Sequence, residues 1–155
     1  MSLNIPTGLV AHVGVALIAA YLFNLNLVVA VFCALLPDLV DKPLTAALNI
    51  EEGRYIAHTL LYVLGVALAF SLWKRRYGLA ALVGGLSHLL LDLGPNNPIF
   101  YPFVRYDYHT GQADFWNYLR NYLTWDGVGV EVMIIVFAAL AVFLFKRLYR
   151  GTVGK

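Results

Sequence analysis

Charged residues are scarce in this sequence. Asp, Glu, Lys and Arg together make up 13% of its 155 residues, whereas hydrophobic residues make up 61%. A soluble domain averages about 25% charged and about 45–50% apolar residues. The scarcity of charge therefore excludes an ordinary soluble domain and indicates an integral membrane protein.

Several other features are missing. Cys33 is the single cysteine, which excludes an internal disulfide and a CxxC metal or redox motif. The first residues, MSLNIPTG, contain no Lys or Arg and precede no clear cleavage site, so we expect no signal peptide. The sequence also lacks the glycine patterns of P-loop and dinucleotide-binding sites. We therefore predict a single integral-membrane domain over residues 1–155.

Five apolar segments follow one another along the chain. They predict an all-α fold, a polytopic membrane bundle of about five hydrophobic helices. Because a transmembrane helix needs roughly 20 apolar residues, the third and fifth segments are long enough, the first and fourth are marginal, and the second is a candidate half-span. The segments cover about Thr7–Phe23, Leu27–Leu36, Arg54–Trp73, Tyr77–Leu93 and Val128–Leu148.

The charges are distributed unevenly between the segments. If the last three segments each cross once, seven basic and no acidic residues lie on one side, against four basic and all nine acidic residues on the other. Excess Lys and Arg mark the cytoplasmic side. We therefore expect a prokaryotic cytoplasmic-membrane protein with a cytoplasmic C-terminus and its acidic residues on the extracytoplasmic side. The seven basic residues are Lys74, Arg75, Arg76, Lys146, Arg147, Arg150 and Lys155.

The connection over residues 94–126 is unusually aromatic, with ten Phe, Tyr and Trp residues. Such rings favour the headgroup zone of a bilayer. Within this extracytoplasmic loop, the stretch ADFWNYLRNYLTW predicts an amphipathic helix lying in the membrane interface.

Ionisable residues lie near the outer ends of all five apolar segments. In the fourth segment, His88 and Asp92 stand four residues apart and so share one helix face. An imidazole and a carboxylate placed in this way suit Zn²⁺, with Mn²⁺ or Fe²⁺ as alternatives. Ionisable groups in membrane segments are costly and usually functional. If the segments run up and down through the membrane, one set of residues lies at a similar depth. These residues are His12, Asp38, Asp41, His58, His88, Asp92 and Glu131.

Simpler interpretations of the single residues stay open. Asp38, directly after a proline, can cap a helix, and His12 can hydrogen-bond a neighbouring helix. Glu131 can pair with an arginine. Asp41 is either a solvated loop charge or a second ligand beside Asp38, and His109 is either a surface histidine or a member of the site. Only the coincidence of several such residues favours a metal centre.

The order of the motifs resembles a known family. His12 is followed by LLPDLVD, GRYIAHT, GLSHLLLD and then GPNNPIFYPF, over roughly residues 8–103. This layout resembles the membrane-bound metal-dependent hydrolases, one branch of which is described as LexA-binding inner-membrane proteins. It is more distantly similar to zinc-dependent phospholipase C and the single-strand nucleases. Two positions depart from the family pattern: Gly53 replaces a histidine, and Asp41 stands one residue later than the family's second aspartate.

The resemblance implies both a ligand set and an activity. The implied ligands of one or more divalent ions, most simply zinc, are His12, Asp38, His58, His88, Asp92 and Glu131. We expect a hydrolase, a phosphoesterase similar to phospholipase C, that acts on a lipid or lipid-linked phosphate at the membrane surface. In that mechanism Asp38 or Asp92 orients a water or accepts its proton, and Arg54 holds a phosphate oxygen. Membrane lipids are the expected partners, and no nucleic acid is expected.

Two functions of other classes compete with hydrolysis. The same cluster is a cation station if the chain is a transporter or a channel. It is a structural site if the chain is a membrane scaffold whose metal positions are all filled by protein. Metal flux into vesicles distinguishes the first alternative, and a fully coordinated ion distinguishes the second.

Overall fold

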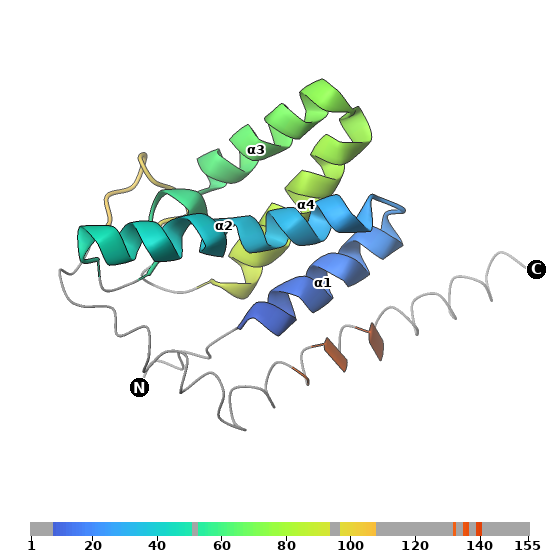
Figure 1. Cartoon of the computed structure of the whole chain (residues 1–155), viewed down its shortest axis with the longest axis horizontal. Helices are drawn as coiled ribbons and strands as arrows, with labels where there is room; N and C mark the ends of the chain where they lie inside the picture. Colours follow the sequence, from blue (N-terminus) through green and yellow to red (C-terminus); the bar gives the residue numbers. More distant parts are fainter. Residues whose placement is uncertain are drawn as a thin grey trace, which may run out of the picture.

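The computed structural model describes residues 8–50, 53–93 and 97–107, together with positions 132, 135, 136, 139 and 140. Over these residues the fold is all-α and contains no strand, as predicted (Figure 1). The elements are α1 (Leu9–Leu22), α2 (Leu27–Leu48), the short 3₁₀ helix η1 (Ile56–His58), α3 (Leu60–Trp73) and α4 (Arg75–Leu91).

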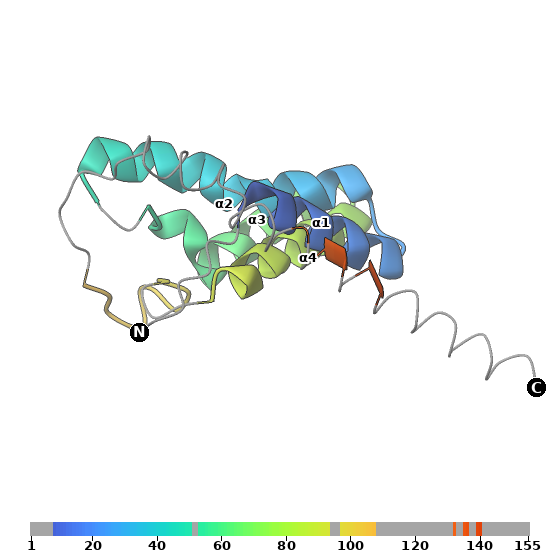
Figure 2. The ribbon, with the colours of Figure 1, turned by 90° about the horizontal axis from the view of Figure 1, so that it is seen from below.

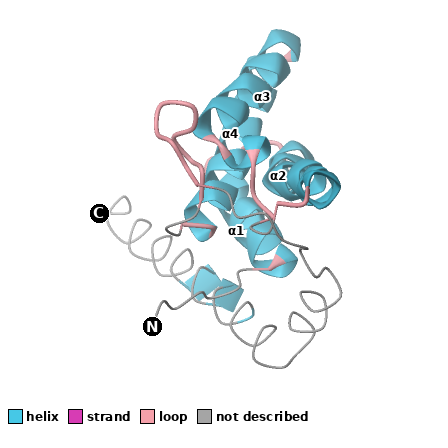
Figure 3. Cartoon of the chain, turned by 90° about the vertical axis from the view of Figure 1, so that its left-hand side faces the viewer, coloured by secondary structure: helices cyan, strands magenta, loops and turns pink. Residues whose placement is uncertain are grey.

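Helix α4 is the central element of the bundle. It packs against α1, α2 and α3, and α2 packs in addition against α1 and η1. Figure 2 shows α1 and α2 beside α4. Helices α3 and α4 are joined at Lys74 and run side by side as a hairpin (Figure 3). The carboxyl end of α4 therefore returns to the beginning of α3, beside η1.

Small residues make the helix interfaces. A Cβ atom added at Gly84 of α4 would collide with the backbone carbonyl oxygen of Ala30 in α2, and one added at Gly78 would collide with Ser71 of α3. The buried apolar residues are mostly alanines, among them Ala20, Ala30 and Ala80. Close approach of backbones over Gly and Ala is typical of helix packing in membranes.

Large apolar side chains lie on the outside instead. Along α3, Leu61, Leu64, Leu68 and Leu72 are 47–83% exposed and form one stripe, because their spacing of three or four residues repeats with the helical turn. Exposed apolar residues also follow α1 and α2, as at Leu17 and Phe32. No helix in the described part of the chain is both long and apolar enough to cross a membrane.

Helix α2 is longer than the sequence predicted. We placed the end of the second segment at Leu36, but α2 continues through Pro37 and Pro43 to Leu48. A proline removes one backbone donor without necessarily ending a helix. The helix instead ends where Asn49 adopts a left-handed conformation, with φ of 54°. This correction places Asp38 on a helix rather than in a cap or turn.

The remaining predicted segments also differ from the structure. The third was predicted to be long enough to span a membrane, but α3 has only 14 residues. The third begins with η1, and α3 starts only at Leu60, where the Thr59 side chain accepts a hydrogen bond of 3.1 Å from the Tyr62 amide. The five described positions of the fifth segment, 132 to 140, are helical. Of these, Ile135 lies against Gly14 of α1. The rest of that segment and the predicted interfacial helix lie outside the described residues.

Candidate metal centre

Three imidazoles and two carboxylates meet where α1, α2, η1 and the end of α4 come together. His12 comes from α1, Asp38 from α2, His58 from η1, His88 from α4, and Asp92 is the C-cap residue of α4. The three histidines are 0–1% exposed and Asp92 is 5% exposed. The structure thus places together five of the six residues proposed as ligands.

Several pairs of possible ligand atoms are separated by the distance expected between two ligands of one ion. His58 Nε2 lies 3.2 Å from His88 Nε2, 3.4 Å from Asp92 Oδ2 and 3.6 Å from Asp38 Oδ1. His12 Nε2 lies 3.5 Å from Asp92 Oδ1. Ligands at about 2.0–2.1 Å from a tetrahedral zinc ion are roughly 3.3 Å apart. Two overlapping triads satisfy a 4.8 Å limit, His12–Asp38–His88 and His58–His88–Asp92.

The hydrogen bonds of two histidines determine which nitrogen faces the centre. His88 Nδ1 lies 2.6 Å from the carbonyl oxygen of Ala34, which can only accept, so Nδ1 carries the proton. His58 Nδ1 lies 2.7 Å from Asp41 Oδ2 and donates in the same way. In the neutral rings, the two Nε2 lone pairs then face each other beside carboxylate oxygens. Such a group of acceptors requires a cation among them, a proton or a metal ion.

Asp41 is the residue that orients His58. Its carboxylate is fully buried and accepts hydrogen bonds from the backbone amides of Tyr55, Ala57 and His58, at 2.7–3.0 Å, as well as from the His58 ring. The interpretation of Asp41 as a solvated loop charge was therefore wrong. A carboxylate that holds the outer nitrogen of a ligating histidine is a common second contact of metal sites.

His12 has an unsatisfied nitrogen. Its ring stacks on that of His88 with centroids 4.0 Å apart, and its Nδ1 atom has no hydrogen-bond partner among the described residues. Buried polar atoms nearly always have a partner. An orphaned nitrogen in this buried ring fits a site that an ion completes.

Two basic side chains pair with the carboxylates of the cluster. Lys42 Nζ lies 2.8 Å from Asp38 Oδ2, and Arg54 Nε lies 3.0 Å from Asp92 Oδ2. The Arg54 pairing with Asp92 adds to its expected contact with a phosphate oxygen. Lys42 was not among the expected site residues, although its position four residues after Asp38 is a signal for such a pair on a helix.

The electrostatic surroundings keep Asp38 ionised. Asp38 lies beyond the apolar segment 27–36. Burial works against its charge, whereas the Lys42 ammonium group 2.8 Å away favours it, and the pKa of Asp38 lies below its usual range. A carboxylate is the form that a metal ion binds.

Gly53 occupies the position of the family's additional histidine. Its backbone adopts a left-handed conformation, with φ of 65°, which a side chain would strain. A Cβ atom there would meet nothing within 4 Å. The local backbone therefore favours glycine at this position. Glu131 and His109 lie outside the described residues.

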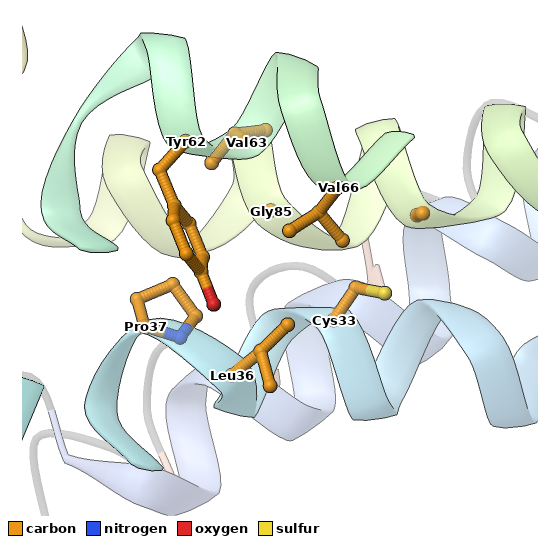
Figure 4. Close-up of a pocket in the computed structure, with 8 residues that line it drawn as sticks. Cys33, Leu36, Pro37, Tyr62, Val63, Val66 and Gly85 are labelled. Carbon is orange, nitrogen blue, oxygen red and sulfur yellow. The ribbon is translucent and has the colours of Figure 1, made fainter. Parts of the chain in front are cut away.

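A small crevice lies beside the centre, between α2, α3 and α4. In Figure 4 the Tyr62 ring points from α3 toward Pro37, the neighbour of Asp38, and Gly85 of α4 lies behind. The volume of the crevice is about 10 Å³, which is about the minimum for one water molecule.

Comparisons with known proteins identify a family without assigning a reaction. No curated protein and no solved structure matches the chain. A family model described as YdjM inner membrane protein matches residues 5–151, which is nearly the whole sequence. This description agrees with the inner-membrane part of the resemblance, and it mentions neither hydrolysis nor phospholipase C. The chain therefore belongs to the YdjM inner membrane protein family.

Proposed function

We propose that this protein is a membrane-embedded, metal-dependent phosphoesterase that acts on a lipid or lipid-linked phosphate at the membrane surface. The observation that carries the proposal is the buried cluster of acceptor atoms, in which His58 and His88 both direct Nε2 toward carboxylate oxygens. Groups of this kind are costly to bury unless a cation binds among them.

The residues that would hold the ion are His12, Asp38, His58, His88 and Asp92. Because both triads use the single inward nitrogen of His88, the geometry supports one ion. Neutral imidazoles with carboxylates suit zinc, and also manganese or iron. When bound, such an ion supplies Lewis acidity for a water molecule and for a phosphoryl oxygen.

The side chains around the ion have different proposed roles. We assign Asp38, whose side chain is 13% exposed, to orienting the attacking water and accepting its proton. Asp92 is 4% exposed and already pairs with His12 and Arg54, so we assign it to binding the ion and to positioning Arg54. The guanidinium of Arg54 would hold a phosphate oxygen.

The distribution of apolar side chains supports a polytopic arrangement. Leucines face outward along α3, and small residues face inward between α2 and α4. The basic residues at the α3–α4 turn lie at the opposite end of the hairpin from the cluster. By the positive-inside rule, we propose that the cluster faces the extracytoplasmic side and that the C-terminus is cytoplasmic.

The test combines metal analysis with hydrolysis. The full-length protein, purified in detergent and loaded with Zn²⁺ or Mn²⁺, should contain about one equivalent of metal and should release phosphate or a phosphorylated headgroup from lipid substrates. His88→Ala should lose at least tenfold in metal affinity and should lose turnover. Arg75→Gln, at the far end of the hairpin, is the matched control and should retain both.

The other outcomes identify the competing functions. Equal turnover in His88→Ala refutes the assignment. Stoichiometric metal with no hydrolysis of any phosphoester indicates a structural site, and metal flux into protein-containing vesicles indicates a transporter.

A further inference from the structure

We infer that Lys42 and Arg54 together form an anion subsite at the mouth of the cluster, and that the group it accepts is a phosphate monoester rather than a diester. The inference rests on the proposed function, because it requires a divalent ion at the centre. It adds to that function a second basic contact and a choice between two substrate classes.

The two basic side chains are more exposed than the rest of the cluster. The Lys42 and Arg54 side chains are 37% and 34% exposed, whereas the carboxylates they contact are 13% and 4% exposed. The three imidazoles are buried. Among the described members of the cluster, the two basic side chains are therefore the most exposed, and they mark the side from which a ligand enters.

The orientation of the two basic groups also supports an anion subsite. Lys42 binds the outer oxygen of Asp38, Oδ2, while Oδ1 of the same carboxylate faces His58. Arg54 binds Asp92 through Nε, at an oxygen that also lies within 3.6 Å of the inward nitrogens of both His58 and His88. Each positive group is thus one carboxylate away from the proposed ion, and Arg54 makes its contact through Nε rather than through a terminal nitrogen.

The summed charge of the site favours an anionic ligand. The carboxylates of Asp38, Asp41 and Asp92 contribute three negative charges, and the two basic side chains contribute two positive charges. With neutral imidazoles and a divalent ion, the described members of the site carry a net charge of about plus one, whereas without the two basic residues they would carry minus one. Lys42 and Arg54 therefore convert a site that would repel anions into one that attracts them.

The number of non-bridging phosphate oxygens distinguishes a monoester from a diester. A phosphate diester has two non-bridging oxygens, and a monoester has three. An ion, a guanidinium and an ammonium group provide three positive partners, which corresponds to the three terminal oxygens of a monoester. A diester would offer only two such oxygens to these three partners, so it would gain fewer charge-assisted contacts than a monoester.

The experiment compares two small esters on the full-length protein in detergent, loaded with Mn²⁺ at pH 8. Calorimetric titration gives the affinities for methyl phosphate, a monoester dianion at this pH, and for dimethyl phosphate. Wild-type protein should bind methyl phosphate at least tenfold more tightly. Lys42→Gln should lose most of this preference, and Lys74→Gln, at the far turn of the hairpin, should retain it. Unchanged Mn²⁺ stoichiometry in Lys42→Gln shows that its site is intact.

The contrary results separate this inference from the proposed function. Equal affinities for the two esters in Mn²⁺-loaded wild-type protein would overturn the inference alone. So would a Lys42→Gln variant that keeps the preference while binding Mn²⁺ more tightly, because Lys42 would then only neutralise Asp38. A wild-type protein that binds no Mn²⁺ or Zn²⁺ would overturn both proposals.

Discussion

At the scale of single residues, Asp41 shows how a buried charge organises the backbone and a histidine ring at the candidate centre. Its carboxylate accepts three backbone amide hydrogens around η1 and the Nδ1 proton of His58. The same group therefore holds the backbone of η1 and selects the ring tautomer. Four donors stabilise the negative charge in place of water.

Asp41→Asn tests this role. The amide has nearly the same size but places donors against the donors of η1, so the His58 ring should lose its orientation. We expect a 10–100-fold loss in affinity for Zn²⁺ or Mn²⁺, since contacts of this kind usually have that effect, together with lower stability against denaturant. Competitive metal titration measures the first effect. Asp107→Asn, on an exposed residue, is the control, and equal affinities in the two variants would remove Asp41 from the site.

At the scale of elements, the contact of α2 with α4 positions the candidate ligands of both helices. Gly84 lets the α4 backbone approach Ala30 of α2. One turn farther along each helix, the carbonyl of Ala34 accepts the hydrogen bond from His88. The small-residue interface and the orientation of the imidazole therefore depend on the same close approach.

Gly84→Ala should separate these two helices. The added methyl group meets backbone atoms of Ala30, which cannot move aside as a side chain could. Overpacking of this kind typically costs about 1–3 kcal/mol, and the affinity for metal should fall with it. Gly65→Ala, where a Cβ atom meets nothing within 4 Å, should instead be neutral or slightly stabilising. Thermal unfolding of both variants in detergent is the measurement, and equal melting temperatures would contradict the argument.

At the scale of the whole molecule, the candidate ligands join elements that are distant in sequence. His12 belongs to α1, Asp38 to α2, His58 to η1 and His88 to α4. An ion bound to all of them would tie these elements together in the folded state alone. Metal binding should therefore appear as stability of the entire bundle.

Removal of the metal should accordingly lower the melting temperature. With free metal at 100 times its dissociation constant, linkage predicts about 2.7 kcal/mol of stabilisation. Thermal unfolding of the detergent-solubilised protein with Zn²⁺, and again after chelation and dialysis, measures the difference. His88→Ala should show almost no difference between the two conditions. A wild-type protein whose unfolding is insensitive to metal would contradict the shared site.

Composition and local spacing determined the features that depend on residues close together in the sequence. A chain with 61% hydrophobic residues favours helices that bury or shield their backbone groups, and the described part of the chain is all-α. The approximate bounds of α1 and α4 followed from the apolar runs. His88 and Asp92 were expected to be neighbours because residues four apart share a helix face, and their side chains lie 3.6 Å apart.

Only the tertiary structure decided how the remaining groups pair. Whether α2 ends at Pro37 or continues to Leu48 depends on what packs against it, and the continuation buries Asp41 beside η1 and directs Lys42 to Asp38. The pairing of Arg54 with Asp92 joins residues 38 positions apart. Such contacts arise from the packing of distant elements, which no local pattern encodes, and they determine which carboxylate faces the imidazoles, which orients a histidine and which pairs with a basic side chain.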